Sequence, residues 1–263
     1  MSPTRLHAVA KPAPTREDLR PVEQGKVQLV SPMTLERYAN GSFSYKEDTV
    51  AVESDIRVHV NGQQHAVLSR TPGDDLNLIV GYLFSCSMIR SAEDILNISF
   101  GYHGTTRVDV QLNAPKSIKR IFPSPRPIRV DPEQLFRFKR DFEHRQNLFK
   151  NTGSTHAAAL FSLEGELLAF GEDVGRHNGF DKAIGRALLE GTLENVAIAM
   201  LSSRLALELA IKASTANIPV LCGFSAATSS AINYAEKNNL TLVGRIRDGV
   251  FNLYANGWRL HTR

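Results

Sequence analysis

The sequence predicts an α/β fold in which helices cover both faces of a sheet. Two short runs in the second half of the chain, residues 196–201 and 218–224, are continuously apolar, as strands buried on both sides are. Each run is followed by a helical pattern, at 202–214 and 225–237, and this alternation is typical of parallel sheets. The last strand pair, 240–254, turns at an Asp-Gly dipeptide and is predicted to be a hairpin.

The chain divides into three predicted parts. Its 263 residues are 42% hydrophobic and 22% charged, which is the composition of a soluble globular protein. Residues 1–26 contain four prolines and no apolar core of a secretory signal, so we expect a flexible tail. Residues 27–130 are expected to form a smaller α+β region, and residues 131–263 the α/β domain.

The N-terminal region shows three local patterns. Residues 51–72 alternate around Asn61-Gly62, which predicts a hairpin. Residues 73–89 are predicted to be a helix and residues 107–113 a strand. The proline-rich segment 114–130 contains five basic residues and is expected to be an extended connector.

The start of the α/β domain is predicted to be largely helical. A helix is expected over 131–149, with one apolar face formed by Leu135, Phe138, Phe142 and Phe149. Phe136 lies off that face, so its side chain is expected to be exposed and available to contact a second copy, which suggests a homodimer. Further elements are expected in the following segments: a helix at 154–162, a strand near 166–172 and a helix at 178–190.

The charge and the cysteines limit the choice of partners. The formal net charge is +4 with a pI of about 9.1, a mild preference for anions that does not indicate nucleic acid. The sequence has no apolar run of membrane-spanning length, so no membrane contact is expected. Cys86 and Cys222, far apart and without metal-ligand spacing, fit a reducing compartment, and we expect a cytoplasmic protein.

Two turns of similar composition follow the two apolar strands. They begin with Ser202-Ser203-Arg204 and Ser225-Ala226, at the sheet edge where α/β folds bind ligands. Hydroxyls and backbone N–H groups at a helix N-terminus attract anions, and Arg204 adds a charge suited to phosphate. Each serine taken alone is better explained as an ordinary helix N-cap. The pair of turns favours a phosphate-bearing ligand.

A second polar cluster occupies residues 172–181. His177 and Asp181 are four residues apart, which is consistent either with a histidine oriented beside a site or with a simple surface pair. Glu172 and Asp173 have no further ligand spacing around them, so we expect them to cap and orient the turn rather than to bind a metal.

These segments resemble a known family. "TGSTHAAALF", "GELLAFGEDVGRHNGFDKAIGRAL", "SSRLALELAIKAS" and "LTLVGRIRDGVFNLY" are similar to the FdhD-type formate dehydrogenase accessory proteins, over about residues 50–255. The resemblance implies a cytidine-deaminase-like three-layer core and a sulfur carrier that takes sulfur from a cysteine desulfurase. The implied ligand is the guanine-dinucleotide form of the molybdenum cofactor, or a GDP-like nucleotide. Formate dehydrogenase and the desulfurase are the implied partners, and a homodimer the implied assembly.

The residues expected to bind this ligand combine the turns with the motifs of the resemblance. Val250 stands where an arginine is common in the family. No catalytic residue is assigned. The candidate ligand-binding residues are His156, Arg176, His177, Ser202, Ser203, Arg204, Ser225, Ala226, Arg245, Ile246, Arg247, Asp248, Gly249 and Val250.

Two motifs are missing from the sequence. Deaminases need His-x-Glu and Pro-Cys-x-x-Cys for zinc and proton transfer, but His156 is followed by two alanines and the second motif is absent, so neither zinc nor deamination is expected. The family's Cys-Gly-x-Cys-Gly loop corresponds to 114–130, which has no cysteine. Cys86 and Cys222 are both expected to be inert core residues. The chain is therefore either a maturation factor that uses an altered sulfur step, or Cys86 or Cys222, or a nucleotide-binding protein without sulfur transfer.

Overall fold

A computed structural model describes residues 27–102, 106–113 and 127–260. The tail predicted over 1–26 and most of the connector predicted over 114–130 lie outside these residues. Within the described ranges, every helix is too short or too polar to cross a membrane.

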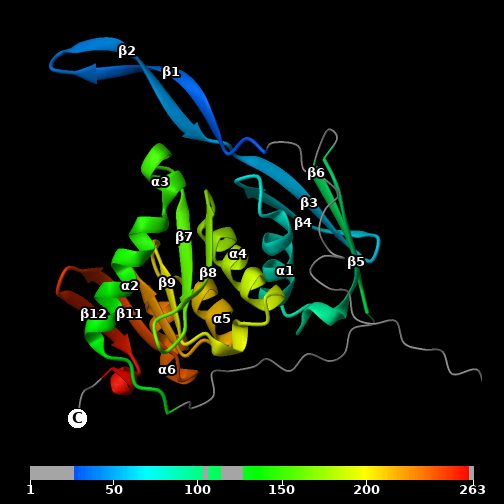
Figure 1. The fold of residues 1–263 in the computed structure, drawn as a ribbon, viewed down its shortest axis with the longest axis vertical. Coiled ribbons are helices and arrows are strands. Elements are labelled where there is room, and N and C mark those ends of the chain that lie inside the picture. Colours follow the sequence, from blue (N-terminus) through cyan, green and yellow to red (C-terminus); the bar gives the residue numbers. More distant parts are fainter. Residues whose placement is uncertain (1–26, 103–105, 114–126, 261–263) are drawn as a thin grey trace, which may run out of the picture.

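A six-stranded sheet forms the centre of the molecule (Figure 1). Its strand order is β12-β11-β10-β9-β7-β8. Three neighbouring strands, β9, β10 and β11, are parallel, but β7 is antiparallel to β8 and β9, and β12 is antiparallel to β11. The sheet is therefore mixed, and the expectation of a parallel sheet holds only for its middle. The strands are β7 (His156–Phe161), β8 (Leu167–Asp173), β9 (Ile198–Leu201), β10 (Val220–Gly223), β11 (Thr241–Arg247) and β12 (Val250–Ala255).

Helices cover both faces of this sheet, which confirms the three-layer core. One face packs on α4 (Arg176–Leu189), α5 (Leu207–Thr215) and α6 (Ser229–Lys237), and the other on α2 (Pro132–Arg145). The two hydrophobic clusters follow the period-2 alternation of the strands. Ala158 and Leu160 belong to the α4 side, and Ala157 and Ala159 to the α2 side.

The N-terminal region adds a second sheet, of order β4-β3-β6-β5, and the helix α1. The predicted hairpin around Asn61-Gly62 is confirmed as β3 and β4. Helix α1 lies between α4 and the second sheet and shares their hydrophobic cluster (Figure 1). The elements are β3 (Ser54–Val60), β4 (Gln63–Arg70), α1 (Asp75–Ser85), β5 (Ile95–Gly101) and β6 (Thr106–Leu112).

A long hairpin projects from the body of the protein (Figure 1). It consists of β1 (Val30–Ala39) and β2 (Ser42–Ala51), joined by Asn40-Gly41, and it forms a separate two-stranded sheet. Both turn residues have positive φ, 53° and 83°, which is why this dipeptide makes a tight hairpin turn. The sequence interpretation did not include this hairpin. The described residues also include three short 3₁₀ helices, Ala92–Asp94, Leu193–Asn195 and Gly257–Arg259.

The helix predicted over 154–162 is wrong, because this segment is strand β7. Its three consecutive alanines favour a helix in isolation. In the fold Ala158 faces α4, whereas Ala157 and Ala159 face α2. Helix α4 approaches the sheet so closely that a Cβ added at Gly171 would lie 2.3 Å from the carbonyl oxygen of Gly179. Small residues are therefore needed here for close helix–sheet packing.

The single helix predicted over 131–149 is also wrong, because α2 ends at Arg145 and a short helix, α3 (Asn147–Thr152), follows. The carboxylate of Glu172 accepts the N–H groups of Leu148 and Phe149, at 3.2 and 2.7 Å, and so starts the new helix. Phe149 thus leaves the predicted apolar face and is 45% exposed. Phe136 is buried against Phe251, so it does not provide the expected contact with a partner.

Candidate cofactor-binding site

The two serine turns end later than the sequence predicted. Helices α5 and α6 begin at Leu207 and Ser229, because Leu205 and Ala227 first pair as a short parallel bridge between the two loops. Ser202 and Ser225 are therefore loop residues and not N-caps. The loops lie side by side beyond the carboxyl ends of β9 and β10, the edge at which such sheets bind ligands.

A cavity of about 550 Å³ opens beside these loops and brings together six of the predicted residues. Three of the side chains that line it are arginines, and none is acidic. The lining residues are Arg204, Ser225, Ala226, Arg245, Arg247, Val250 and Asn252. We call this cavity the arginine pocket.

A β-bulge in β11 places two of these arginines. The pairing of β11 with β12 shifts between Gly244 and Arg247, and Arg245 has a left-handed φ of 53°. The N–H of Arg245 donates to the carbonyl oxygen of Ser225 at 3.0 Å. A Cβ at Gly244 would lie 2.7 Å from that oxygen, so glycine is required for this close approach. The bulge thus binds the β11–β12 hairpin to the second loop.

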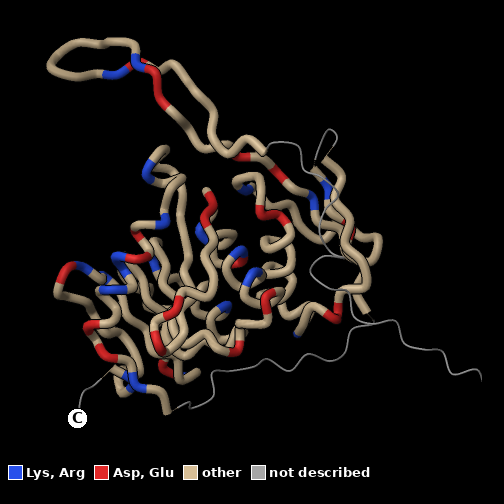
Figure 2. Tube along the Cα trace, in the orientation of Figure 1, with Lys and Arg blue, Asp and Glu red and all other residues tan. Residues whose placement is uncertain are grey.

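The arginines of the pocket differ in how firmly they are held. Arg247 donates to the carbonyl oxygen of Phe224 at 2.8 Å, which fixes its guanidinium at the pocket wall. Within the described ranges, Arg204 and Arg245 form no side-chain hydrogen bond or ion pair. Figure 2 shows basic and acidic positions close together near the β11–β12 hairpin. Asp248 is the single acidic residue of this hairpin, and its side chain is 99% exposed. The pocket therefore offers uncompensated positive charge to an anion.

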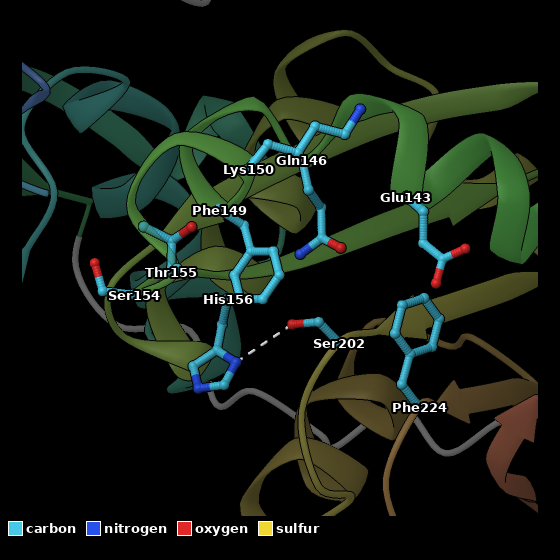
Figure 3. Close-up of a pocket in the computed structure, with 10 residues that line it drawn as sticks. Glu143, Gln146, Phe149, Lys150, Ser154, Thr155, His156, Ser202 and Phe224 are labelled. Carbon is cyan, nitrogen blue, oxygen red and sulfur yellow. Dashed lines mark hydrogen bonds between the residues drawn. The ribbon is translucent and has the colours of Figure 1, made fainter. Parts of the chain in front are cut away.

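A second cavity, of about 500 Å³, lies on the other side of the same two loops (Figure 3). Ser202 and Phe224 of these loops line it, together with residues from α2, α3 and the start of β7. We call it the aromatic pocket because Phe149 and Phe224 both line it. Its lining residues are Glu143, Gln146, Phe149, Lys150, Gly153, Ser154, Thr155, His156, Ser202 and Phe224.

His156 and Ser202 form a polar pair in the aromatic pocket. Nδ1 of His156 lies 3.3 Å from Oγ of Ser202, which also accepts the N–H of Ala157 at 3.0 Å (Figure 3). Because that N–H occupies one acceptor site, the Ser202 hydroxyl is free to donate to the imidazole. The pair therefore ties the start of β7 to the end of β9 and leaves Nε2 of His156 for a ligand.

Positive charge surrounds both histidines of the predicted site. Burial first, and then Arg176, lower the pKa of His156 below its ordinary value. Burial, Lys212 and Arg176 likewise lower the pKa of His177. Nε of Arg176 is buried without a hydrogen-bond partner in the described structure. The N-terminus of α4 thus adds a second basic region near His156.

The predicted interaction of His177 with Asp181 does not orient the histidine. The carboxylate of Asp181 accepts instead from Ser85, at 2.7 Å, and forms an ion pair with Lys212. Asp181 acts on His177 only through its charge, which opposes the lowering of the pKa. Its main role is to join α1, α4 and α5.

Glu172 and Asp173 have the structural role that the sequence predicted. Glu172 starts helix α3, as described above, and also accepts from the hydroxyl of Thr155 at 2.8 Å. Asp173 is fully buried, accepts from the N–H of Gly175 at 2.8 Å, and forms an ion pair with Lys182 at 2.7 Å. Among the described residues, no group of three or more His, Cys, Asp or Glu side chains is arranged to hold a metal.

Six predicted residues line neither pocket. Two of them, Arg176 and His177, lie at the start of α4, and the other four lie near the arginine pocket. Ser203 is buried and donates to the carbonyl oxygen of Arg204, and Ile246 lies in the core. Asp248 and Gly249 form the turn of the β11–β12 hairpin, where Gly249 has a φ of 75°. These four residues shape the arginine pocket without lining it.

The two cysteines differ from each other, so the expectation that both are core residues is wrong for Cys86. Cys222 is fully buried in β10, and burial raises the pKa of its thiol. Cys86 is exposed at the C-terminus of α1. Its thiol lies close to Tyr82 and Asp181, and partial burial first, then the Asp181 charge, raise the pKa of the thiol, while Lys212 opposes this.

Comparison with known proteins identifies the family. The model of the FdhD/NarQ family matches residues 51–122 and 102–261. The chain belongs to this family. It is 35% identical over 266 residues to the sulfur carrier protein FdhD of Streptomyces avermitilis, covering 86% of this chain and 94% of that protein. It is 36% identical over 244 residues to the protein of the same name from Sulfurisphaera tokodaii, covering 84% and 95%.

The fold agrees with a solved structure. A crystal structure described as a formate dehydrogenase accessory protein from Desulfotalea psychrophila superposes with a TM-score of 0.78 and 23% sequence identity. The match covers 89% of this chain and all of the other. At this identity the likeness concerns the fold.

Sequence reasoning missed the residues that make the aromatic pocket. Phe149 was placed at the end of the helix predicted over 131–149, and Lys150 just beyond it. Because α2 ends at Arg145, both residues instead lie in α3 and line the pocket. Phe224 of the aromatic pocket directly follows strand β10, next to the second serine turn. Asn252 of the arginine pocket is a polar residue of the last hairpin, close to the arginines. For both residues, this position in the sequence is the only feature that could have indicated them.

Proposed function

We propose that this protein acts in formate dehydrogenase maturation by binding the guanine-dinucleotide form of the molybdenum cofactor. The observation that carries the proposal is the arginine pocket, where Arg204, Arg245 and Arg247 line one cavity without an acidic residue. Such a cavity fits a diphosphate, because a guanidinium group can donate two parallel hydrogen bonds to two oxygens of one phosphate. The names of the relatives connect the family with formate dehydrogenase and sulfur.

The aromatic pocket would hold a planar ring of the same ligand. It adjoins the arginine pocket across the two loops, since Ser202 and Phe224 line one cavity while Arg204 and Ser225 line the other. Aromatic side chains stack on bases of any sequence, and that contact contributes about 1–3 kcal/mol per base in nucleic-acid-binding proteins. Nε2 of His156 is a polar group available to such a ring. The charge of Glu143 in this pocket is balanced by Lys139, 2.8 Å away.

The sulfur step of the family cannot follow its usual route in this chain. A persulfide carrier needs an accessible thiolate, and residues 114–130 contain no cysteine. Cys222 is buried, and the raised pKa of the Cys86 thiol disfavours its thiolate. We therefore expect no stable persulfide. Incubation with a cysteine desulfurase and radiolabelled cysteine tests this; label that is lost in Cys86→Ser would identify a relocated sulfur carrier.

Because one thiol is buried and the pKa of the other is raised, a second candidate function is also favoured. In that case the protein binds a guanine nucleotide or dinucleotide cofactor and takes no part in sulfur delivery. A cell that lacks its own accessory protein separates the two functions. We expect the wild-type chain to restore formate dehydrogenase activity and Arg204→Ala/Arg245→Ala to fail. Nucleotide binding without restored activity would favour the second candidate. The protein would bind its proposed partners, formate dehydrogenase and a cysteine desulfurase, in the cytoplasm.

A further inference from the structure

Gln146 is a buried polar side chain without a partner. It is 5% exposed, and among the described residues its side chain forms no hydrogen bond. A buried polar group that lacks a hydrogen bond destabilises a protein, so such groups are rare in native structures. Figure 3 shows the amide of Gln146 inside the aromatic pocket, between the rings of Phe149 and Phe224. The partner of this amide is therefore expected to be a ligand in the pocket.

The break between α2 and α3 determines where this amide points. Gln146 is the residue between the two helices, and its ψ of 68° turns the chain out of α2. Its carbonyl oxygen accepts the N–H of Lys150 at 3.0 Å, in the first turn of α3. Glu172 accepts the N–H groups of Leu148 and Phe149 in the same turn. The backbone of Gln146 is thus fixed, and its side chain extends into the pocket from a rigid support.

Glu143 places a second polar group one helical turn before this amide. Residues three apart in a helix lie on the same side, and both residues line the aromatic pocket. The ammonium group of Lys139 lies 2.8 Å from the carboxylate of Glu143 and holds it in place. A carboxylate has about four acceptor sites, so some remain free for a ligand. The amide of Gln146 can donate and accept, whereas the carboxylate of Glu143 can only accept.

We propose that Gln146 and Glu143 select the ring that the aromatic pocket binds. The amide of Gln146 donates to a ring carbonyl, and the carboxylate of Glu143 accepts from the ring N–H and the amino group beside that carbonyl. Guanine has these three groups in this order along one edge, and a pterin has the same edge. Adenine has a ring nitrogen without hydrogen at the middle position, which the carboxylate repels. The ring is part of the proposed ligand, so the inference rests on the proposed function.

The aromatic and the polar residues of this pocket have different roles. Phe149 and Phe224 accept any flat ring, because stacking does not depend on the hydrogen-bonding groups of the ring. A site built to hydrogen-bond a ligand group, in contrast, rejects an analogue without that group, since the polar groups of the site are then left unpaired. Gln146 supplies such a group. Glu143, which can only accept, determines the order of donors and acceptors that the ring must have.

Calorimetry on the full chain with GDP and with neopterin, a pterin without phosphate, tests the role of Gln146. Gln146→Met keeps the length of the side chain and removes its polar groups. We expect it to weaken GDP binding about tenfold, which assigns the guanine ring to the pocket; a loss confined to neopterin assigns the pterin ring instead. Gln134→Met, on the same helix but outside the pocket, should bind as the wild type does. Unchanged binding of both compounds by Gln146→Met overturns the inference alone, and a wild type that binds neither compound overturns the proposed function as well.

IDP, which lacks the ring amino group of GDP, tests the role of Glu143. The wild type should bind IDP about tenfold more weakly than GDP, because a hydrogen bond to a charged group is lost. Glu143→Ala should bind the two nucleotides alike, whereas Gln146→Met and the control Glu133→Ala should keep the difference. Equal binding of GDP and IDP by the wild type contradicts the role of Glu143.

The melting temperature of the ligand-free protein separates ring selection from a structural role of Gln146. Because the amide has no partner within the described protein, Gln146→Met removes an unpaired polar group and should keep or raise Tm. An amide that stabilises the fold would instead lower Tm when it is removed. A Tm of Gln146→Met several degrees below that of the wild type therefore contradicts the inference.

Discussion

Replacing Arg204 by alanine should weaken the binding of GDP about tenfold. The side chain is exposed and has no partner in the described structure, so its removal leaves no buried group unpaired. The loss is then only that of its contact with phosphate. A hydrogen bond to a charged group contributes about 1.5–3 kcal/mol, and solvent exposure favours the lower end. About 1.4 kcal/mol corresponds to a factor of ten in Kd.

Isothermal calorimetry with GDP measures this effect against a matched control. Arg57→Ala removes the same charge from an exposed position on β3, in the other sheet, and should leave the Kd within about twofold. Guanosine, which lacks the diphosphate, should bind the wild type and Arg204→Ala equally. The reasoning is refuted if GDP binds Arg204→Ala as tightly as it binds Arg57→Ala, or if the wild type does not bind GDP.

Three further predictions concern the scaffold around the pockets. A Cβ at Gly81 would lie 1.9 Å from the backbone oxygen of Asp181, so Gly81→Ala should cost about 1–3 kcal/mol and lower Tm by several degrees. A Cβ at Gly101 would lie 4.0 Å from the backbone oxygen of Arg107, an ordinary contact, so Gly101→Ala should leave Tm unchanged; equal melting temperatures of the two variants would contradict this. Burial and then Arg176 lower the pKa of His156, so the unfolded chain binds the proton more tightly and stability falls as pH drops below about 6.5. His156→Gln should reduce the loss in denaturant midpoint between about pH 7.5 and 5.5, and an unchanged loss would refute the assignment. Iodoacetamide should modify one thiol of the native protein and both thiols after unfolding, with two reactive native thiols as the contrary result.

The sequence predicted best where local pattern and tertiary burial agree. The Asn61-Gly62 hairpin, helix α1, and the strands β9 to β11 were all predicted from local patterns. Arg204 was predicted from its serine turn, whereas Arg245 was predicted only from the family resemblance, and the structure places both in one pocket. Glycine-dependent turns and continuous apolar strands are determined by a few neighbouring residues.

The failures occurred where distant contacts decide the structure. Three alanines in β7 favour a helix in isolation, but in the fold they are buried between α4 on one face of the sheet and α2 on the other. Helix α2 ends because Glu172, far along the chain, caps the next helix. The serine loops run past their expected helix starts because Leu205 and Ala227 pair across them. None of these contacts has a local sequence pattern.

The measurement that tests the central claim most directly is the cofactor content of the protein purified from cells that make the guanine-dinucleotide cofactor. The fluorescent oxidation product of molybdopterin, together with released GMP, reports the bound cofactor. We expect both from the wild type and from Arg57→Ala, and neither from Arg204→Ala/Arg245→Ala. Equal cofactor in the wild type and the pocket variant, or none in the wild type, would contradict the assignment of the arginine pocket.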